Sequence, residues 1–228
     1  MTSRIALASL AAALLGATSL GATAADLPSR KTAPTMTAID PWNPWMIRGR
    51  ALVVMPQESA SLRMGGAPIV GGDVSISTSV VPELDITYFF TRNLAVELIL
   101  GVTPHNVKGA GALAGARIGS AWLLPPTLTL QYHFDPIGAF KPYVGAGINY
   151  TVFFDEKAKG GFTSFNLKDS FGFALQAGVD IMLDKHWGIN FDVKKLFLEP
   201  KVKVNGGAVS GKVKIDPWIF GTGITYKF

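Results

Sequence analysis

The sequence contains no cysteine, and charged residues make up only 16% of its 228 residues. Without thiols the chain can form neither disulfides nor cysteine-ligated metal sites, so the fold must be held by noncovalent pairing. There are three histidines and no two of them are spaced i, i+4, so we expect no zinc site and no cofactor. Lysines and arginines are scattered rather than clustered, which argues against nucleic-acid binding despite a net charge of +5.

Long apolar runs are also scarce, and the single one lies at the start of the chain. Arg4 precedes an apolar segment from Ile5 to Leu20, and Ala22-Thr23-Ala24 supplies a small-residue cleavage site. This pattern is typical of a secretory signal peptide, which we assign to residues 1–25. A transmembrane anchor is the alternative, but the run is short and Ala-rich for a span of about 20 residues.

Beyond this segment, apolar residues alternate with polar ones. Hydrophobic residues make up 48% of the chain, yet no later stretch of about 18 uncharged apolar residues could form a transmembrane helix. Residues 26–44 are polar and Pro-rich, which indicates a periplasmic N-terminal arm. In residues 45–228, period-2 alternation accommodates the apolar content, as in an outer-membrane β-barrel.

Eight segments show this alternation. In residues 121–134, for example, Leu128 and Leu130 oppose Thr129 and Gln131. The connections are alternately long and short, which predicts an all-β fold: an eight-stranded antiparallel up-and-down transmembrane β-barrel with long external loops and short periplasmic turns. The expected strands are 45–56, 74–90, 94–103, 121–134, 142–154, 171–183, 187–204 and 212–228.

The last expected strand, which includes FGTGITYKF (220–228), stops on an aromatic residue. We expect this strand to pair with the first and close the barrel. The spacing of Gly223, Tyr226 and Phe228 resembles the signal read by the bacterial outer-membrane assembly machinery, so we expect that machinery to be a partner. The final strand of a soluble sandwich is the alternative interpretation.

Two blocks give a more specific resemblance. LPPTLTLQYHF (124–134) and KPYVGAGINYTVFF (141–154) are similar to the OmpW family of small outer-membrane proteins. PELDITYFFTRNLAVEL (82–98) and DSFGFALQAGVDIML (169–183) support this resemblance. It implies an eight-stranded barrel with a narrow, partly apolar interior in the bacterial outer membrane. It also implies passage of small hydrophobic molecules, with sideways release into the bilayer as one route.

Ionisable residues fall on the inward faces of the expected strands. An eight-stranded barrel has an interior just wide enough for side chains or one small ligand. We therefore interpret these residues as a polar network that fills the lumen, with an open polar pathway as the alternative. The set is Arg48, Arg50, Glu83, Asp85, Glu97, Asp180, Asp192 and Lys194.

Apolar residues in the expected external loops could form a mouth for hydrophobic solutes, where flexible methionine suits varied shapes. Proline donates no ladder hydrogen bond, so prolines within strands are candidates for a lateral exit. Pro125 and Pro126 are the preferred pair, and Pro82 and Pro217 are further candidates. The mouth candidates are Leu62, Met64, Ile69, Leu113 and Phe162.

These features favour passive passage of small hydrophobic molecules across the outer membrane. A non-conducting structural or adhesion barrel, whose external loops bind partners, is the alternative. A lipid-modifying enzyme is less favoured, because no histidine is followed two positions on by a serine nucleophile. A soluble ligand-binding barrel is the remaining interpretation. The expected partners are outer-membrane lipids, lipopolysaccharide, the assembly machinery and small hydrophobic solutes, while the solute and the oligomeric state stay open.

Overall fold

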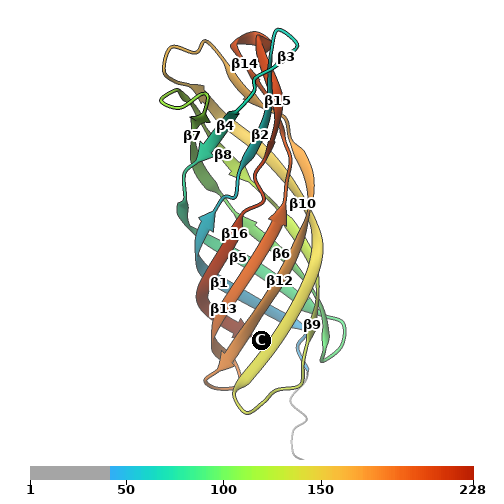
Figure 1. Ribbon diagram of the computed structural model, residues 1–228. Coiled ribbons are helices and arrows are strands. Elements are labelled where there is room, and N and C mark those ends of the chain that lie inside the picture. The colour runs from blue at the N-terminus through green and yellow to red at the C-terminus, as the bar shows by residue number, and fades with distance from the viewer. Residues whose placement is uncertain (1–41) are drawn as a thin grey trace, which may run out of the picture. The chain divides into compact units, whose positions relative to one another are not determined.

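The computed structural model describes residues 42–228, which form an antiparallel eight-stranded β-barrel (Figure 1). The predicted signal peptide and most of the predicted arm lie outside the described residues. The first strand begins at Trp45, where the alternation begins in the sequence. No helix within residues 42–228 is long and apolar enough to cross a membrane.

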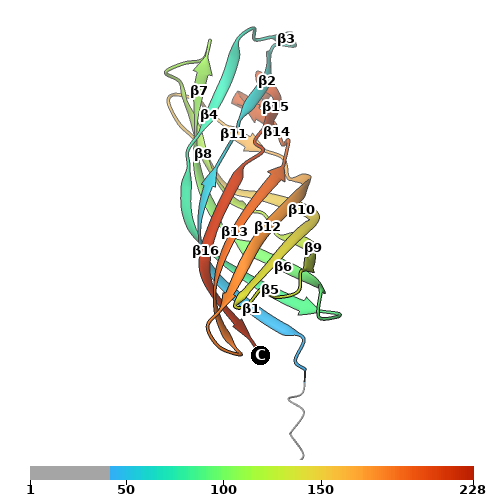
Figure 2. The same cartoon turned by 60° about the horizontal axis from the view of Figure 1, so that its bottom comes forward.

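Seven of the eight crossings are divided into a lower and an upper strand. We call lower the end that carries the short turns, and upper the opposite end. The fifth crossing is one continuous strand, β10 (Phe140–Ala158), drawn in yellow in Figures 1 and 2. The lower strands are β1 (Trp45–Met55), β5 (Ser79–Phe89), β6 (Leu94–Gly101), β9 (Thr127–His133), β12 (Ser170–Met182), β13 (Trp187–Phe197) and β16 (Trp218–Lys227). The upper elements are β2 (Ser59–Met64), β3 (Ala67–Pro68), β4 (Gly72–Ile76), β7 (Thr103–Gly111), β8 (Arg117–Leu124), β11 (Phe165–Leu167), β14 (Lys201–Val204), the 3₁₀ turn η1 (Asn205–Gly207) and β15 (Val209–Lys214).

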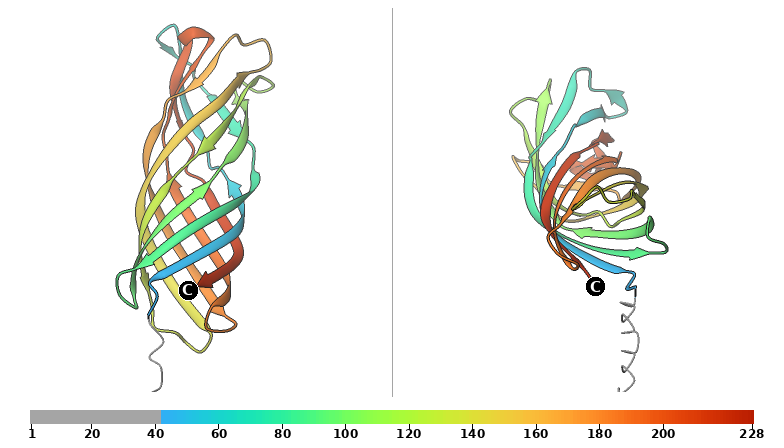
Figure 3. Two further views of the ribbon diagram at one scale, coloured as in Figure 1. Left: turned by 180° about the vertical axis from the view of Figure 1, so that it is seen from behind. Right: turned by 90° about the horizontal axis from the view of Figure 1, so that it is seen from below.

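The lower strands form a closed ring. Their order is β12-β13-β16-β1-β5-β6-β9-β10, and pairing of β10 with β12 completes the circle (Figure 3). The first and last crossings pair as expected, with Met46 opposite Lys227 and Met55 opposite Trp218. Because the lower ring is closed, it has no strand edge whose backbone N–H and C=O groups would face lipid without a hydrogen-bond partner.

Side chains in the lower ring are sorted as in a membrane barrel. In β9, Thr127, Thr129 and Gln131 are buried in the interior, while Leu128 and Leu130 are exposed on the outer wall. This is the reverse of a soluble barrel, because hydrocarbon is the solvent outside and polar groups must find partners inside. Exposed aromatic side chains lie towards both ends of the lower ring, as in an aromatic girdle: Trp45, Phe90, Tyr132 and Trp187 below, and Trp122, Phe154, Phe197 and Trp218 above.

The upper strands form two separate sheets. One has the order β10-β8-β7-β4 and the other β11-β14-β15-β2-β3. Much of what the sequence predicted as loop is therefore strand, including residues 104–111 and residues 59–64. The period-2 signal is weak here because small residues occupy both faces; at Gly109 a side chain would collide with the carbonyl of Leu113.

Carboxylates close the two seams between these sheets. At the β2–β4 seam, Asp73 Oδ1 accepts the N–H of Ala60 at 2.8 Å, and Glu58 Oε1 accepts the N–H of Ile76 at 2.9 Å. At the β10–β11 seam, Glu156 Oε1 accepts the N–H of Leu167 at 2.5 Å. Side chains thus replace backbone partners along two sheet edges.

Candidate solute-binding site

The barrel interior changes from polar to apolar along its axis. The even-numbered residues of β13 and β14 face inward: Asn190 and Lys194 in the lower strand, Val202 and Val204 in the upper one. The outer wall changes from apolar to polar in the same direction, since Lys201 is exposed above the aromatic residues. The upper strands therefore have the pattern of a water-exposed barrel, with an apolar interior and a polar outer face. The lower strands have the pattern of a membrane barrel, with a polar interior and an apolar outer face.

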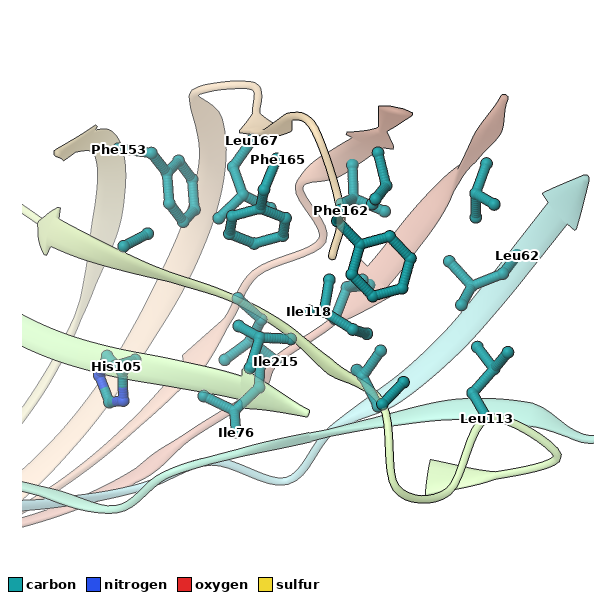
Figure 4. Close-up of a pocket in the computed structure, with 18 of the residues that line it drawn as sticks. Leu62, Ile76, His105, Leu113, Ile118, Phe153, Phe162, Phe165, Leu167 and Ile215 are labelled. Atoms are coloured by element: carbon teal, nitrogen blue, oxygen red, sulfur yellow. The ribbon is translucent and has the colours of Figure 1, made fainter. Parts of the chain in front are cut away.

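An apolar cavity of about 180 Å³ lies between the upper sheets. Phe153, Phe162 and Phe165 project into it beside aliphatic side chains from β2, β8 and β15 (Figure 4). In the described chain, His105 is the one polar residue among its lining side chains. All five predicted mouth residues line this cavity: Leu62, Met64, Ile69, Leu113 and Phe162.

A smaller cavity of about 40 Å³ follows below. His105, Leu123 and Ile215 line both cavities and so mark the junction between them. Glu83 and Lys194 line the lower cavity, and they belong to the ionic network beneath it. The lining therefore changes from apolar to charged side chains at this level.

Arg48 holds one half of that network. Its guanidinium makes a two-pronged contact with Asp180, with Nε 3.1 Å from Oδ1 and Nη2 2.6 Å from Oδ2. It also donates to Glu97 and, at 3.2 Å, to Thr87 Oγ1. All four side chains are buried, so these charged groups are satisfied by one another rather than by water.

Arg50 holds the other half. Its Nη2 lies 2.6 Å from Asp85 Oδ2, and its Nε lies 3.0 Å from Glu83 Oε1. Lys194 Nζ connects Glu83, at 2.6 Å, to Asp192, at 3.2 Å. The structure thus joins all eight residues that the sequence placed in the lumen, three basic and five acidic. Sequence reasoning missed the neutral side chains that hydrogen-bond to these charged groups: Thr87, Tyr143, Gln176, Asn190 and Thr225.

The barrel wall has a gap beside Pro82. Pairing of β5 with β6 ends at Glu83 and Gly101. Pairing between this crossing and the next resumes at Ser77, whose N–H donates to the carbonyl of Asn106 at 3.0 Å, and continues at Ile76 and Val107. Pro82 and Pro104 lie on the two sides of the gap, where neither can donate a ladder hydrogen bond. An open groove occupies this place on the outer wall, and it shares Glu83 and Gly101 with the lower cavity.

Pro125 and Pro126 also interrupt a crossing, between β8 and β9. Their carbonyl groups are nevertheless bonded to the neighbouring crossing. Asn149 Nδ2 donates to the Pro125 oxygen at 3.1 Å, and the N–H of Tyr150 donates to the Pro126 oxygen at 3.1 Å. Pro125 lines the lower cavity. The role of this pair as an exit stays a prediction.

The three residues of the expected assembly signal lie on β16 or next to it. Gly223 pairs with Arg50 on one side and with Asn190 on the other. Tyr226 packs edge-on against Phe228 with ring centroids 4.8 Å apart. The N–H of Phe228 donates to the carbonyl of Trp45 at 3.2 Å. These residues therefore lie at the junction of the first and last crossings.

Two features of the site were missed at the level of sequence. Sequence reasoning considers His105 as a metal ligand or as a catalytic base, not as a residue of an apolar cavity. Residues 42–228 contain no group of three or more histidine or acidic side chains placed to hold a metal ion. The valines of β14 and β15 were not assigned to an apolar interior. The alternation of KVKV at 201–204 carried that information, since lysine and valine cannot both face the same solvent.

Comparison with known proteins agrees with this architecture. Residues 44–228 match the model of the OmpW family. An uncharacterized outer-membrane protein, y4mB, of Sinorhizobium fredii is 53% identical, covering 91% of this chain and 90% of that protein. Outer membrane protein W of Escherichia coli is 35% identical, covering 81% of this chain and 88% of that protein. The crystal structure of OprG from Pseudomonas aeruginosa superposes with a TM-score of 0.76 at 35% identity, covering 81% of this chain and 95% of OprG. The chain therefore belongs to the OmpW family and is a β-barrel protein of the bacterial outer membrane.

Proposed function

We propose that this barrel takes up small apolar molecules at its upper, external end and passes them into the outer membrane. The observation that carries the proposal is the apolar cavity of about 180 Å³ between the upper sheets. Ligand pockets are typically concave and mostly apolar, with a small number of placed polar groups. The external leaflet of the outer membrane has a polar surface, which an apolar solute crosses slowly. An apolar cavity at that level would give the solute a favourable environment before it reaches the hydrocarbon.

The ionic network favours a sideways route over a straight one. Arg48, Arg50 and their partners fill the lower barrel with paired charges, and an apolar solute could replace none of these contacts. The groove beside Pro82 and Pro104 shares Glu83 and Gly101 with the lower cavity and lies on the outer wall. We place the exit there in preference to Pro125 and Pro126, because a backbone bond from Tyr150 to Pro126 continues the pairing with β10 and neither proline lines the outer groove.

Uptake of naphthalene by whole cells tests the proposal. Cells that produce the protein should take it up faster than cells without it. Met64→Asp and Leu113→Asp should reduce the gain, because each puts a carboxylate into the apolar lining. Val70→Asp is the matched control, since Val70 is 87% exposed and does not line the cavity. Equal uptake in cells with and without the protein would refute the proposal and favour the structural barrel.

The exit is tested separately at Gly101. An added Cβ there would meet the Pro82 carbonyl at an ordinary contact distance of 3.5 Å, so Gly101→Ala should be tolerated. Gly101→Phe should obstruct the groove and lower uptake, while naphthalene still binds to the purified barrel. Unchanged uptake by a folded Gly101→Phe barrel would exclude this groove as the exit.

A further inference from the structure

His105 is the single polar residue lining the upper cavity within the described chain, and it lies where that cavity meets the lower one. The ring is 5% exposed. A histidine in such a place is unusual, because a buried polar group without a partner is costly. The ring is held by hydrogen bonds at only one of its two nitrogens.

That side is Nδ1. It lies 2.6 Å from the carbonyl oxygen of Ser77 and 3.4 Å from Ser79 Oγ. A carbonyl oxygen can only accept, so Nδ1 carries the hydrogen. The Ser79 hydroxyl donates to the Pro104 carbonyl, so its oxygen is free to accept as well. In the neutral ring, Nε2 is then a hydrogen-bond acceptor.

Nε2 has no hydrogen-bond partner among residues 42–228. The other side chains that line the upper cavity are apolar, and threonines, Glu83 and Lys194 appear only in the lining of the lower cavity. No carboxylate of the described chain forms an ion pair with the ring. An imidazolium at this place would be an unpaired charge beside an apolar cavity. The neutral ring instead offers one acceptor to a molecule that brings a donor.

We propose that the solutes of this site are molecules with an apolar body and a single hydroxyl group, such as an aromatic or aliphatic alcohol. The apolar body would lie among Phe162, Phe165 and Leu113, and the hydroxyl would donate to His105 Nε2. This inference rests on the proposed function and narrows it to a substrate class. A site built to hydrogen-bond a hydroxyl discriminates against the analogue that lacks it, because its own acceptor is then left unpaired.

His105 lies where the proposed path of the solute passes from the upper cavity to the wall gap. It is the residue after Pro104, at the edge of the wall gap, and it lines both cavities. A solute anchored there by its hydroxyl keeps its apolar body in the upper cavity while the donor already points towards the lower one. His105 would therefore orient the solute at the point where the path turns from the mouth to the wall.

The experiment compares 2-naphthol with naphthalene, which share one apolar body. Binding to the folded barrel in lipid nanodiscs is measured by fluorescence, and binding to empty nanodiscs is subtracted. We expect His105→Phe, which keeps the ring and removes the acceptor, to weaken 2-naphthol binding by about tenfold, as loss of one buried hydrogen bond implies. Naphthalene binding should stay within about twofold. Leu113→Ala is the control and should weaken both ligands alike.

A third probe needs no substitution. 2-Methoxynaphthalene keeps the oxygen and lacks the donor, so it should bind to the unmodified barrel no better than naphthalene. Equal affinity for 2-naphthol and 2-methoxynaphthalene, or a parallel loss of 2-naphthol and naphthalene in His105→Phe, would overturn the inference and leave the proposed function intact. Absence of binding by all three probes would refute the proposed function itself.

Discussion

Arg48 and Asp180 face each other across the barrel interior in a two-pronged contact, with nitrogen–oxygen distances of 3.1 and 2.6 Å. β1 and β12 are not neighbours in the ring, so this pair connects opposite parts of the wall. A buried ion pair has little net value compared with well-packed apolar side chains, but removing one partner leaves a buried charge unpaired. The lower barrel is therefore sensitive to the loss of any one charge in the network.

Asp180→Ala should lower the free energy of unfolding in lipid vesicles by about 3–5 kcal/mol, because Arg48 loses the carboxylate that contacts its guanidinium at two points. The matched control is Glu199→Ala at the Lys212–Glu199 pair, whose side chains are 57% and 48% exposed. That change should cost less than about 1 kcal/mol. Urea titrations of the folded barrels provide the comparison, and equal costs at the two sites would contradict the role given to the network.

Leu128 and Ile148 lie directly opposite each other on the outer wall, each 45% exposed. Leu128→Arg should destabilise the barrel by about 2–4 kcal/mol if this level is the bilayer midplane, since the guanidinium would lie in hydrocarbon. Leu128→Phe keeps the site apolar and should change little. The unfolding midpoint in lipid vesicles measures both, and an unchanged midpoint for Leu128→Arg would show that this wall does not face lipid.

The orientation of the barrel can be read by labelling single cysteines, because the natural chain has none. Val70, near the upper end, is 87% exposed, and Ile137, in a lower turn, is 74% exposed. A membrane-impermeant maleimide should label Val70→Cys in intact cells and leave Ile137→Cys unlabelled, since long connections are external and short turns periplasmic. Both should react after the outer membrane is permeabilised. The opposite pattern would invert the topology.

Asp73 joins β4 to β2 through its carboxylate rather than through backbone pairing. Asp73→Ala should increase amide hydrogen exchange at Ala60 and Val74 by about fivefold, because both N–H groups lose the same acceptor. Asp73→Asn keeps a side-chain carbonyl oxygen and should exchange almost as slowly as the natural protein. If exchange at Ala60 were the same in all three, the carboxylate would not hold this seam.

Phe228 and Phe220 are exposed to similar extents, 46% and 48%, and both lie at the last crossing. We expect Phe228→Ala to lower the fraction of heat-modifiable, membrane-inserted barrel in cells, because Phe228 belongs to the proposed assembly signal with Gly223 and Tyr226. Phe220→Ala removes an equally exposed ring outside that signal and should assemble normally. Equal assembly of the two variants would count against the signal.

The lower barrel could be predicted from the sequence because its pattern is strong. Leu128, Leu130 and Tyr132 alternate with Thr127, Thr129 and Gln131, and each apolar side chain faces out. The inward charged residues could be chosen by the same alternation. Their partners could not, because Arg48 and Asp180 are 132 positions apart and meet only when the ring closes.

The upper barrel was less predictable. Glycine and alanine dominate residues 109–116, so no period appears there and the sequence predicts a loop; the structure has a turn at 112–115 but strand at 109–111. The mouth residues could be named because they are apolar, but nothing in the chain showed that side chains from β2, β8 and β15 would surround one space. The wall gap was equally hard to predict, because it depends on Pro82 and Pro104, which belong to different crossings and lie side by side only in the folded barrel.

The sequence by itself determined the architecture: an export pattern, eight alternating segments and blocks that resemble the OmpW family. Period-2 alternation is a local property, so it survives in a linear chain. Only the tertiary structure decided where the apolar interior begins, where the wall is open and what His105 faces. These are properties of side chains brought together from distant strands, and the register of ring closure, not the order of residues, sets which of them meet.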